Sequence, residues 1–244
     1  MAGHNKWSKV KHIKGPADAK RAKIFSKLSR EIVVAVKEGA SDDPSMNPRL
    51  RMVLLKARQA NMPLDNVQRA IQKATGEGGA ANYQDLTYEI YGPHGVAILA
   101  EISSDNKNRT AAEIRHILSK NGGSIASAGA VTRLFHRKGQ IMIARDSVDE
   151  ERVMEIALEA GAEDFNAEPE GYEIITEPNQ FEEVLKKIDD AKIPTETAGI
   201  TCLPELNSPV PPEATESIQK LIDTLDDHDD VKDVYSNAEF QEET

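Results

Sequence analysis

Hydrophobic positions in the first third of the chain recur at three- and four-residue steps, the period of an amphipathic helix. The first such stretch runs from about Asp18 to Glu38 and ends at Gly39. A second begins after Asn47, which can cap it with Pro48 in its first position, and Pro63 starts a third. The pattern predicts a small bundle of three helices.

The period changes after GEGGAAN, residues 76–82, which is a linker by composition. LTYEIY (86–91) and GVAILAEI (95–102) read as two strands joined by a Gly-Pro-His-Gly turn, with His94 as a turn residue. A third strand is expected over AVTRLFH, residues 130–136. This part of the chain therefore begins a β-sheet.

A helix is expected between the second and third of these strands. Thr110 and Glu113 have the spacing of a capping box, and the helix should reach about Lys120, where Asn-Gly-Gly ends it. The segment thus has the order strand, strand, helix, strand.

From Gln140 the pattern gives a second unit of six elements. They are a strand (140–144), a helix (148–160), two strands (163–168 and 172–177), a helix (179–191) and a strand (199–203). This βαββαβ order is typical of ferredoxin-like folds.

A final helix (212–225) and strand (231–236) remain, and they would supply the αβ that the first sheet lacks. The predicted class is α+β, with an N-terminal three-helix bundle followed by two α/β (ferredoxin-like) domains, one inserted in the other. The expected domains are residues 1–80, a second domain in two segments (81–138 and 207–244), and an inserted domain (139–206).

Composition points to a cytoplasmic protein. Mean hydropathy is −0.51 over 244 residues, and neither an apolar run of membrane-spanning length nor the apolar region of a secretory signal occurs. An organelle-targeting peptide stays open, although such peptides favour Arg and Ser over the Lys found here. Cys202 is the single cysteine, which excludes an internal disulfide and a cysteine-based metal site.

Charge is strongly segregated along the chain. Residues 1–79 hold 16 Lys or Arg and 7 Asp or Glu, whereas residues 80–244 hold 14 and 34. The formal charge of −11 therefore hides a basic N-terminal third, and the acidic average says nothing against nucleic-acid binding.

The sharpest candidate site is this basic N-terminus. Lysines can neutralise phosphates, and Trp7 can stack on an exposed base. The plainer alternative is a solvated tail with Trp7 against the bundle, but the cations continue along one face of the first helix. The expected nucleic-acid-binding residues are Lys6, Trp7, Lys9, Lys11, Lys14, Lys20, Arg21, Lys23, Lys27 and Arg30.

Several separated motifs resemble one known family. They are GHNKWSKVKHIKGPADAKRAKIF, NPRLRMVLLKARQANMP, YGPHGVAILAEISSDNKNRTAAEIRH and NGG, and together they are similar to the YebC/PmpR family of probable transcriptional regulators. The resemblance implies three domains, a cytoplasmic location in bacteria, no cofactor and no known catalysis. It also implies either DNA binding or, as an alternative, action on the ribosome at proline-rich stalls; mitochondrial members are translational activators.

Two weaker binding surfaces are suggested. The second and third helices have a connection of helix-turn-helix length, with Asn66, Arg69 and Gln72 as base-reading candidates, although ordinary exposed polar residues explain them too. Residues 103–110 open a helix where Lys107 and Arg109 could hold a phosphate, although helix capping explains the neighbouring residues equally well.

The sequence offers no catalytic or metal constellation. Cys202 alternates with Ile200 and reads as a small core residue, the six histidines lack ligand spacing, and residues 76–82 lack the Lys-Ser or Lys-Thr of a P-loop. The acidic run DDHDD, residues 226–230, reads as a solvated helix end.

We therefore expect a non-enzymatic, nucleic-acid-binding regulator whose partner is DNA, RNA or both. A promoter-binding transcriptional regulator is the first hypothesis, and a translation factor that binds ribosomal RNA is the alternative. No membrane, small-molecule substrate, cofactor or metal is expected.

Overall fold

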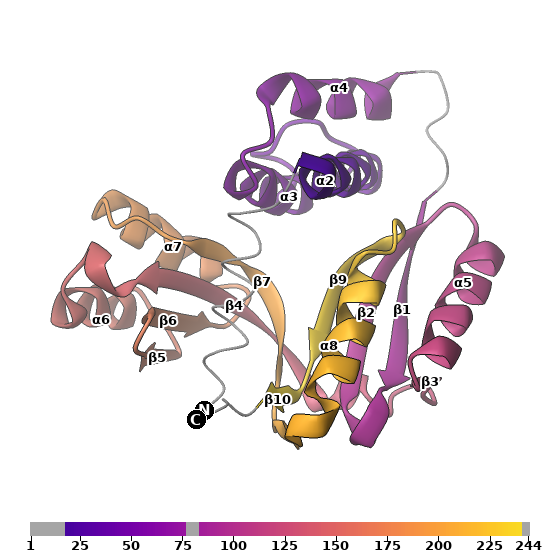
Figure 1. Ribbon diagram of the computed structural model, residues 1–244. Coiled ribbons are helices and arrows are strands. Elements are labelled where there is room, and N and C mark those ends of the chain that lie inside the picture. Colours follow the sequence, from indigo (N-terminus) through magenta and orange to yellow (C-terminus); the bar gives the residue numbers. More distant parts are fainter. Residues whose placement is uncertain (1–17, 77–82, 241–244) are drawn as a thin grey trace.

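The computed structural model describes residues 18–76 and 83–240 (Figure 1). The arm residues Lys6, Trp7, Lys9, Lys11 and Lys14, and the linker over 77–82, lie outside the described residues. The fold class is as expected, because a bundle of three helices is followed by two sheet-and-helix domains.

The N-terminal bundle consists of α2 (Asp18–Glu38), α3 (Pro48–Gln59) and α4 (Leu64–Thr75). Its core includes Ile32 and Leu50, both fully buried. The predicted cap of α3 is confirmed: Asn47 Oδ1 accepts a hydrogen bond from the Leu50 amide at 3.0 Å, and Pro48 occupies the first helical position.

Gly39 follows α2 at a point where the Asn47 side chain lies too close to the backbone for a Cβ atom. A Cβ atom there would lie 2.2 Å from Asn47 Nδ2, while the left-handed residue of this turn is Ala40, with φ of 48°. The same Asn47 amide donates to the carbonyl oxygens of Ala35 and Ser41, both at 2.8 Å. The Asn47 side chain thus ties the end of α2 to the start of α3.

The second domain is a four-stranded sheet in the order β3-β1-β2-β9. Its strands are β3 (Ser124–Ile125), β1 (Gln84–Tyr91), β2 (Ala97–Ser104) and β9 (Val231–Ser236). The predicted hairpin of β1 and β2 is confirmed, and its turn is a short 3-10 helix over Pro93–Gly95 in which His94 has φ of 57°.

Two helices, α5 (Lys107–Lys120) and α8 (Pro212–Asp226), pack on one face of this sheet (Figure 1). Buried residues from both helices and from β1, β2 and β9 form one hydrophobic core, which includes Ile98, Ile114 and Leu221. The late elements α8 and β9 therefore complete the sheet that the earlier segment begins.

Two sequence predictions in this domain are wrong. The expected strand over 130–136 is a 3-10 turn at Thr132–Leu134 that leads into β4, because Val131 turns inward to fill the core. The cap of α5 is Asn106 rather than Thr110: Asn106 Oδ1 accepts from the Arg109 amide at 3.1 Å, and Thr110 already lies inside the helix.

The inserted unit is ferredoxin-like. Its sheet has the order β5-β6-β4-β7, and every neighbouring pair is antiparallel. The elements are β4 (Phe135–Ala144), α6 (Glu150–Glu159), β5 (Asp164–Ala167), β6 (Gly171–Thr176), α7 (Phe181–Asp190) and β7 (Thr197–Pro204). The chain returns through β8 (Ser208–Val210), which pairs in parallel with β10 (Ala238–Phe240).

We propose the domain boundaries expected from the sequence, namely 1–80, 81–138 with 207–244, and 139–206. The two sheets support this division, although β4 begins at Phe135 and so spans the proposed boundary.

The three parts share buried surfaces. Phe135, Cys202, Leu99 and Tyr235 form an apolar cluster between the two sheets, so Cys202 is a core residue as expected. The bundle lies above both sheet domains, with α3 against β7 (Figure 1). Helix α2 is thereby held close to the C-terminal end of α8.

Candidate nucleic-acid interface

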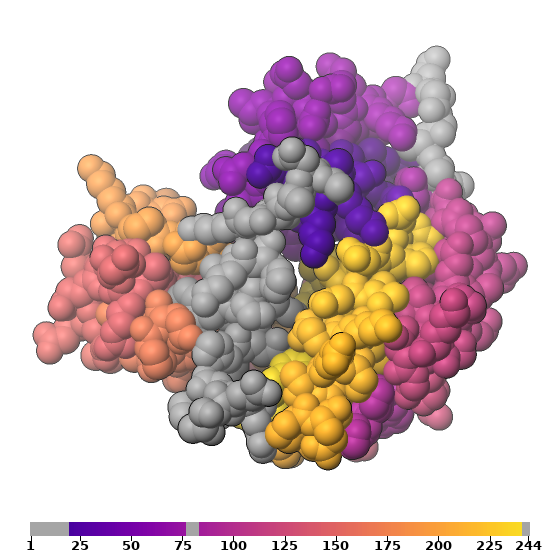
Figure 2. Space-filling view, in the orientation of Figure 1, coloured from indigo at the N-terminus to yellow at the C-terminus, as the bar shows by residue number. Residues whose placement is uncertain are grey.

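Helix α2 carries the described half of the predicted basic site, and its cations divide into two groups. Lys20 and Arg21 are exposed. Lys23, Lys27 and Arg30 are partly buried, because this side of α2 faces the segment at the end of α8. In Figure 2 the indigo surface of α2 lies beside the yellow surface of the C-terminal segment.

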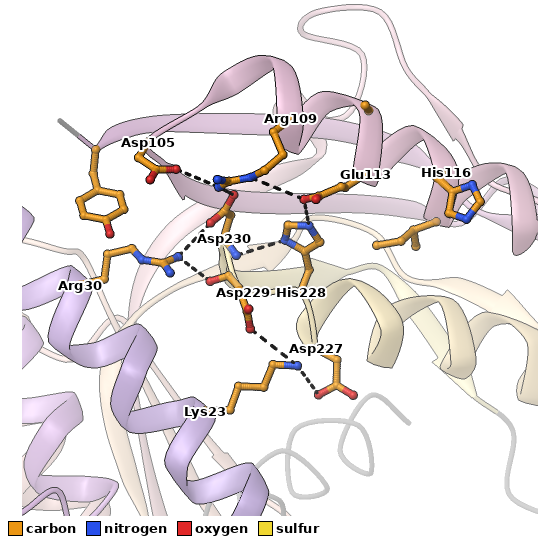
Figure 3. A pocket seen from close by; sticks show the side chains of 13 residues that line it. Lys23, Arg30, Asp105, Arg109, Glu113, His116, Asp227, His228, Asp229 and Asp230 are labelled. Carbon is orange, nitrogen blue, oxygen red and sulfur yellow. Dashed lines mark hydrogen bonds and ion pairs between the residues drawn. The ribbon is translucent and has the colours of Figure 1, made fainter. Parts of the chain in front are cut away.

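We call residues 226–230 the acidic segment. Lys23 Nζ lies 3.9 Å from carboxylate oxygens of both Asp227 and Asp229 (Figure 3). Lys27 Nζ donates to the carbonyl oxygen of Asp226, and burial lowers the pKa of Lys27 despite that acidic neighbour. The acidic segment is therefore a contact surface for α2. The expected solvated helix end is confirmed for Asp226, Asp227 and Asp229, which are exposed, and is wrong for Asp230, which is buried.

Arg30 makes the strongest of these contacts. Its Nη1 donates to the Asp229 carbonyl oxygen at 2.6 Å and to Asp230 Oδ1 at 3.1 Å. The Arg30 guanidinium also lies over the Tyr83 ring, 5.1 Å from its centroid, where the negative ring face attracts a cation.

Asp230 is the buried centre of the contact, with a side chain 4% exposed. Besides Arg30, Asp230 Oδ2 accepts from Arg109 Nη2 at 2.7 Å and from Thr110 Oγ1 at 2.6 Å. Burial alone would raise the pKa of Asp230, but these hydrogen bonds and the charges of Arg109 and Arg30 hold that pKa below its ordinary value. Asp230 is therefore ionised at neutral pH.

The two cations of the suggested phosphate site at the start of α5 have different surroundings. Lys107 is exposed, whereas the Arg109 guanidinium is already paired with Asp105 at 2.8 Å and with Asp230. The chain thus places a carboxylate of its own beside the first turn of α5, where a phosphate was expected. Arg109 is exposed as well, its side chain to 43%, but its guanidinium is engaged by the protein's own carboxylates.

A cleft of about 760 Å³ lies between α2, α5 and the acidic segment (Figure 3). Its lining mixes both signs of charge, since Lys23, Arg30 and Arg109 are offset by carboxylates from α5, the acidic segment and Asp105. The lining is thus not a uniformly positive pocket for an anion.

Three side chains in this region have the proximity of metal ligands. One ligand atom each from Glu113, His228 and Asp230 lie within 4.8 Å of one another. His228 Nδ1, however, accepts a hydrogen bond from the Asp230 backbone amide at 3.1 Å, and His228 Nε2 lies 2.9 Å from Glu113 Oε2. The hydrogen-bond network assigns the proton to Nε2, so both ring nitrogens are already engaged within the protein. These hydrogen bonds connect the acidic segment to Glu113 of α5.

The helix-turn-helix candidates lie on the outermost helix. Helix α4 packs on α2, and Gln72 is exposed, as is Arg69. The Arg69 side chain donates to Asn66 Oδ1 at 2.7 Å and to the Asp65 carbonyl oxygen at 3.1 Å. Two of the three candidate side chains, Asn66 and Arg69, are thus bonded to each other.

The sequence did not reveal Lys56, which joins the bundle to the second domain. Its Nζ lies 2.8 Å from Asp233 Oδ2 and 3.5 Å from Glu31 Oε2. Burial alone would lower the pKa of Lys56, but the negative charges of Asp233 and Glu31 have the larger effect and raise that pKa. The pKa of Glu31 is itself raised, mainly by burial. Its two partners lie far apart in the chain, so no local pattern could have indicated the contact.

Among the described residues, none of the helices combines the length and apolar character needed to cross a bilayer.

The comparisons with known proteins agree over almost the whole chain. Residues 5–77 match the TACO1/YebC protein N-terminal domain, and residues 83–238 match the TACO1/YebC second and third domain. A probable transcriptional regulatory protein of Desulfatibacillum aliphaticivorans is 50% identical, covering 100% of this chain and 98% of that protein.

Other relatives give the same result. A probable transcriptional regulatory protein of Treponema denticola is 48% identical over 99% of this chain and 98% of its own length. The crystal structure of a conserved hypothetical protein from Aquifex aeolicus superposes with a TM-score of 0.83 at 40% identity, over 95% of this chain and 96% of that one. The chain belongs to the TACO1/YebC family.

Proposed function

We propose that this protein is a non-enzymatic, cytoplasmic regulator that binds nucleic acid through its basic arm and the exposed cations of its helical domain. The contacts are those of Lys6, Lys9, Lys11 and Lys14 with phosphates, with Trp7 stacking on a base. Lys20 and Arg21, exposed at the start of α2, continue this surface into the folded domain.

The observation that carries the proposal is the segregation of charge between the parts of the molecule. The first 79 residues hold 16 cations against 7 acids, and the remainder holds 14 against 34. Neutralising phosphates releases condensed counterions, so a concentrated set of cations supports binding even when the whole chain is acidic. The acidic domains repel bare nucleic acid at short range, because the Debye length is about 8 Å at physiological salt.

DNA is the first target that we propose. Full-length relatives are named probable transcriptional regulatory proteins, which favours a regulator of transcription. A structured RNA surface remains the competing target, since lysines meet the same phosphate chemistry there and acidic domains could face basic ribosomal proteins.

The first test compares the full-length protein with a variant in which Lys6, Lys9, Lys11 and Lys14 are replaced by Gln. Affinity for a mixed-sequence DNA duplex and for an RNA hairpin is measured across a range of salt concentrations. We expect the slope of log affinity against log salt to fall by about 0.9 for each duplex phosphate that the variant no longer neutralises. Equal affinities and slopes for both proteins would refute the role of the arm.

A matched pair of single substitutions tests the folded part of the surface. Lys20→Gln should lower the salt slope by about one, whereas Lys186→Gln, on α7 of the inserted domain, should leave it unchanged. Equal effects of the two substitutions would mean that only the total charge matters.

The choice between DNA and RNA requires the protein in its cell. Crosslinking, purification under denaturing conditions and separate DNase and RNase treatment would identify the bound polymer. Discrete promoter segments would support a transcriptional regulator, and ribosomal RNA from one location would support a translation factor instead.

A further inference from the structure

Helix α2 presents three cations in one row toward the acidic segment. Lys23, Lys27 and Arg30 are spaced by four and three residues, so their side chains follow one stripe of the helix. Their partners are oxygen atoms of the four aspartates of the acidic segment. These are Asp226, Asp227, Asp229 and Asp230, with His228 between the two pairs. A row of cations therefore meets a row of anionic and carbonyl oxygens.

These contacts use the donors that a phosphate would need. The Arg30 guanidinium donates to the Asp229 carbonyl oxygen and to Asp230, and Lys27 Nζ donates to the Asp226 carbonyl oxygen. A phosphate backbone also presents a row of hydrogen-bond acceptors, which are negatively charged oxygens. The two partners would have to occupy the same side of α2, so they exclude each other.

The contact is uneven in strength along the row. Asp230 is buried and hydrogen-bonded to α5, whereas the side chains of Asp227 and Asp229 are 61% and 78% exposed. The latter two reach Lys23 at 3.9 Å only, and exposed pairs of this kind are weak and screened by salt. This outer part of the contact is the part that an approaching polyanion can displace.

We propose that the acidic segment mimics nucleic-acid phosphates and competes for the basic stripe of α2. The inference rests on the proposed function, and it adds a means of regulating the same surface. Lys20 and the arm meet nucleic acid first, and Lys23 of the stripe joins them when Asp227 and Asp229 are displaced. Weak polyanions are thereby excluded from the stripe, whereas a target held firmly by the arm gains the additional contacts.

A zero-length carbodiimide crosslink between Lys23 and Asp227 or Asp229 reports the contact directly in the full-length protein. Peptide mass spectrometry should detect this crosslink without nucleic acid, and saturating DNA duplex or RNA hairpin should reduce it several-fold. The crosslink between Lys138 and Glu163, whose atoms lie 2.6 Å apart within the inserted domain, is the internal control and should not change.

The second experiment weakens the competitor. The double variant Asp227→Asn with Asp229→Asn should bind the same duplex or hairpin on the order of three- to tenfold more tightly than the unchanged protein. A matched variant, Glu155→Gln with Glu159→Gln on α6, changes the net charge equally and should have a smaller effect.

The outcomes separate the two proposals. If the unchanged protein binds neither polymer, the proposed function fails and the competition fails with it. If it binds but the Lys23 crosslink persists at saturation, or if the two double variants gain affinity equally, only the competition is refuted.

Discussion

Arg30 Nη1 lies 3.1 Å from Asp230 Oδ1, and this contact joins residues 200 positions apart in the chain. The Arg30 side chain is 20% exposed and that of Asp230 is 4% exposed, so the pair is largely shielded from water. Because Asp230 also binds Arg109 and Thr110, one carboxylate connects α2 of the bundle, α5 and the strand β9 that follows it. Asp230 is thus one of the groups that join the bundle to the second domain.

Asp230→Asn should destabilise the protein. The substitution leaves Arg30 and Arg109 without their shared anion, and removing one partner of a buried pair costs about 3 to 5 kcal/mol. Arg109 is 43% exposed and can regain water, so we expect about 2 to 3 kcal/mol in urea unfolding. Lys186→Ala, which breaks an exposed pair with Asp190, is the control and should cost about 0.5 kcal/mol or less. Equal losses for the two variants would contradict a central role for Asp230.

Asp230 should also contribute to the acid sensitivity of the fold. Its pKa is lowered in the folded protein, so its stabilisation is fully present above the unfolded value of about 3.9 and is lost as pH falls through the lower folded pKa. Unfolding free energies measured at several pH values below about 5 should therefore fall less steeply in Asp230→Asn than in the unchanged protein. Parallel curves would show that other carboxylates account for the acid sensitivity.

Replacing Lys56 should weaken the junction between the bundle and the second domain. In Lys56→Met the carboxylates of Glu31 and Asp233 lose the cation between them, and Glu31 is only 11% exposed. We expect a loss of about 2 to 4 kcal/mol in unfolding free energy. The double variant with Glu31→Gln should recover part of it, because the buried negative charge is then removed as well. Failure of the second change to recover any stability would mean that Lys56 acts by packing alone.

Gly39→Ala should be destabilising for a steric reason. The new Cβ would approach the Asn47 side chain to 2.2 Å and disturb its bonds to Ala35 and Ser41. Crowding of this kind costs about 1 to 3 kcal/mol. Gly199→Ala is a suitable control, because a Cβ there meets no atom within 4 Å, and its effect should stay within about 0.5 kcal/mol. Thermal or urea unfolding of both variants provides the comparison.

Local patterns predicted most of the elements correctly. The three N-terminal helices, the hairpin and the βαββαβ unit follow from the spacing of apolar residues, because side-chain periods of 3.6 and 2 are local properties of helix and strand. The expected strand at 130–136 failed where local preference and packing disagree. Val131 and Phe135 are apolar enough for a strand, but both enter the cluster between the two sheets, and the backbone between them turns.

The candidate site shows the same limit. The chain sequence is sufficient to establish that its N-terminal third is basic, and to assign Lys20, Lys23, Lys27 and Arg30 to one side of α2. It could not separate the exposed Lys20 from the three cations that face the acidic segment. Their partners lie about two hundred residues away, at the end of α8, and they meet α2 because α8 and β9 join the first sheet after the inserted domain. Periodicity and composition are properties of residues that are close in the sequence, whereas the pairing of distant charges depends on how whole domains pack.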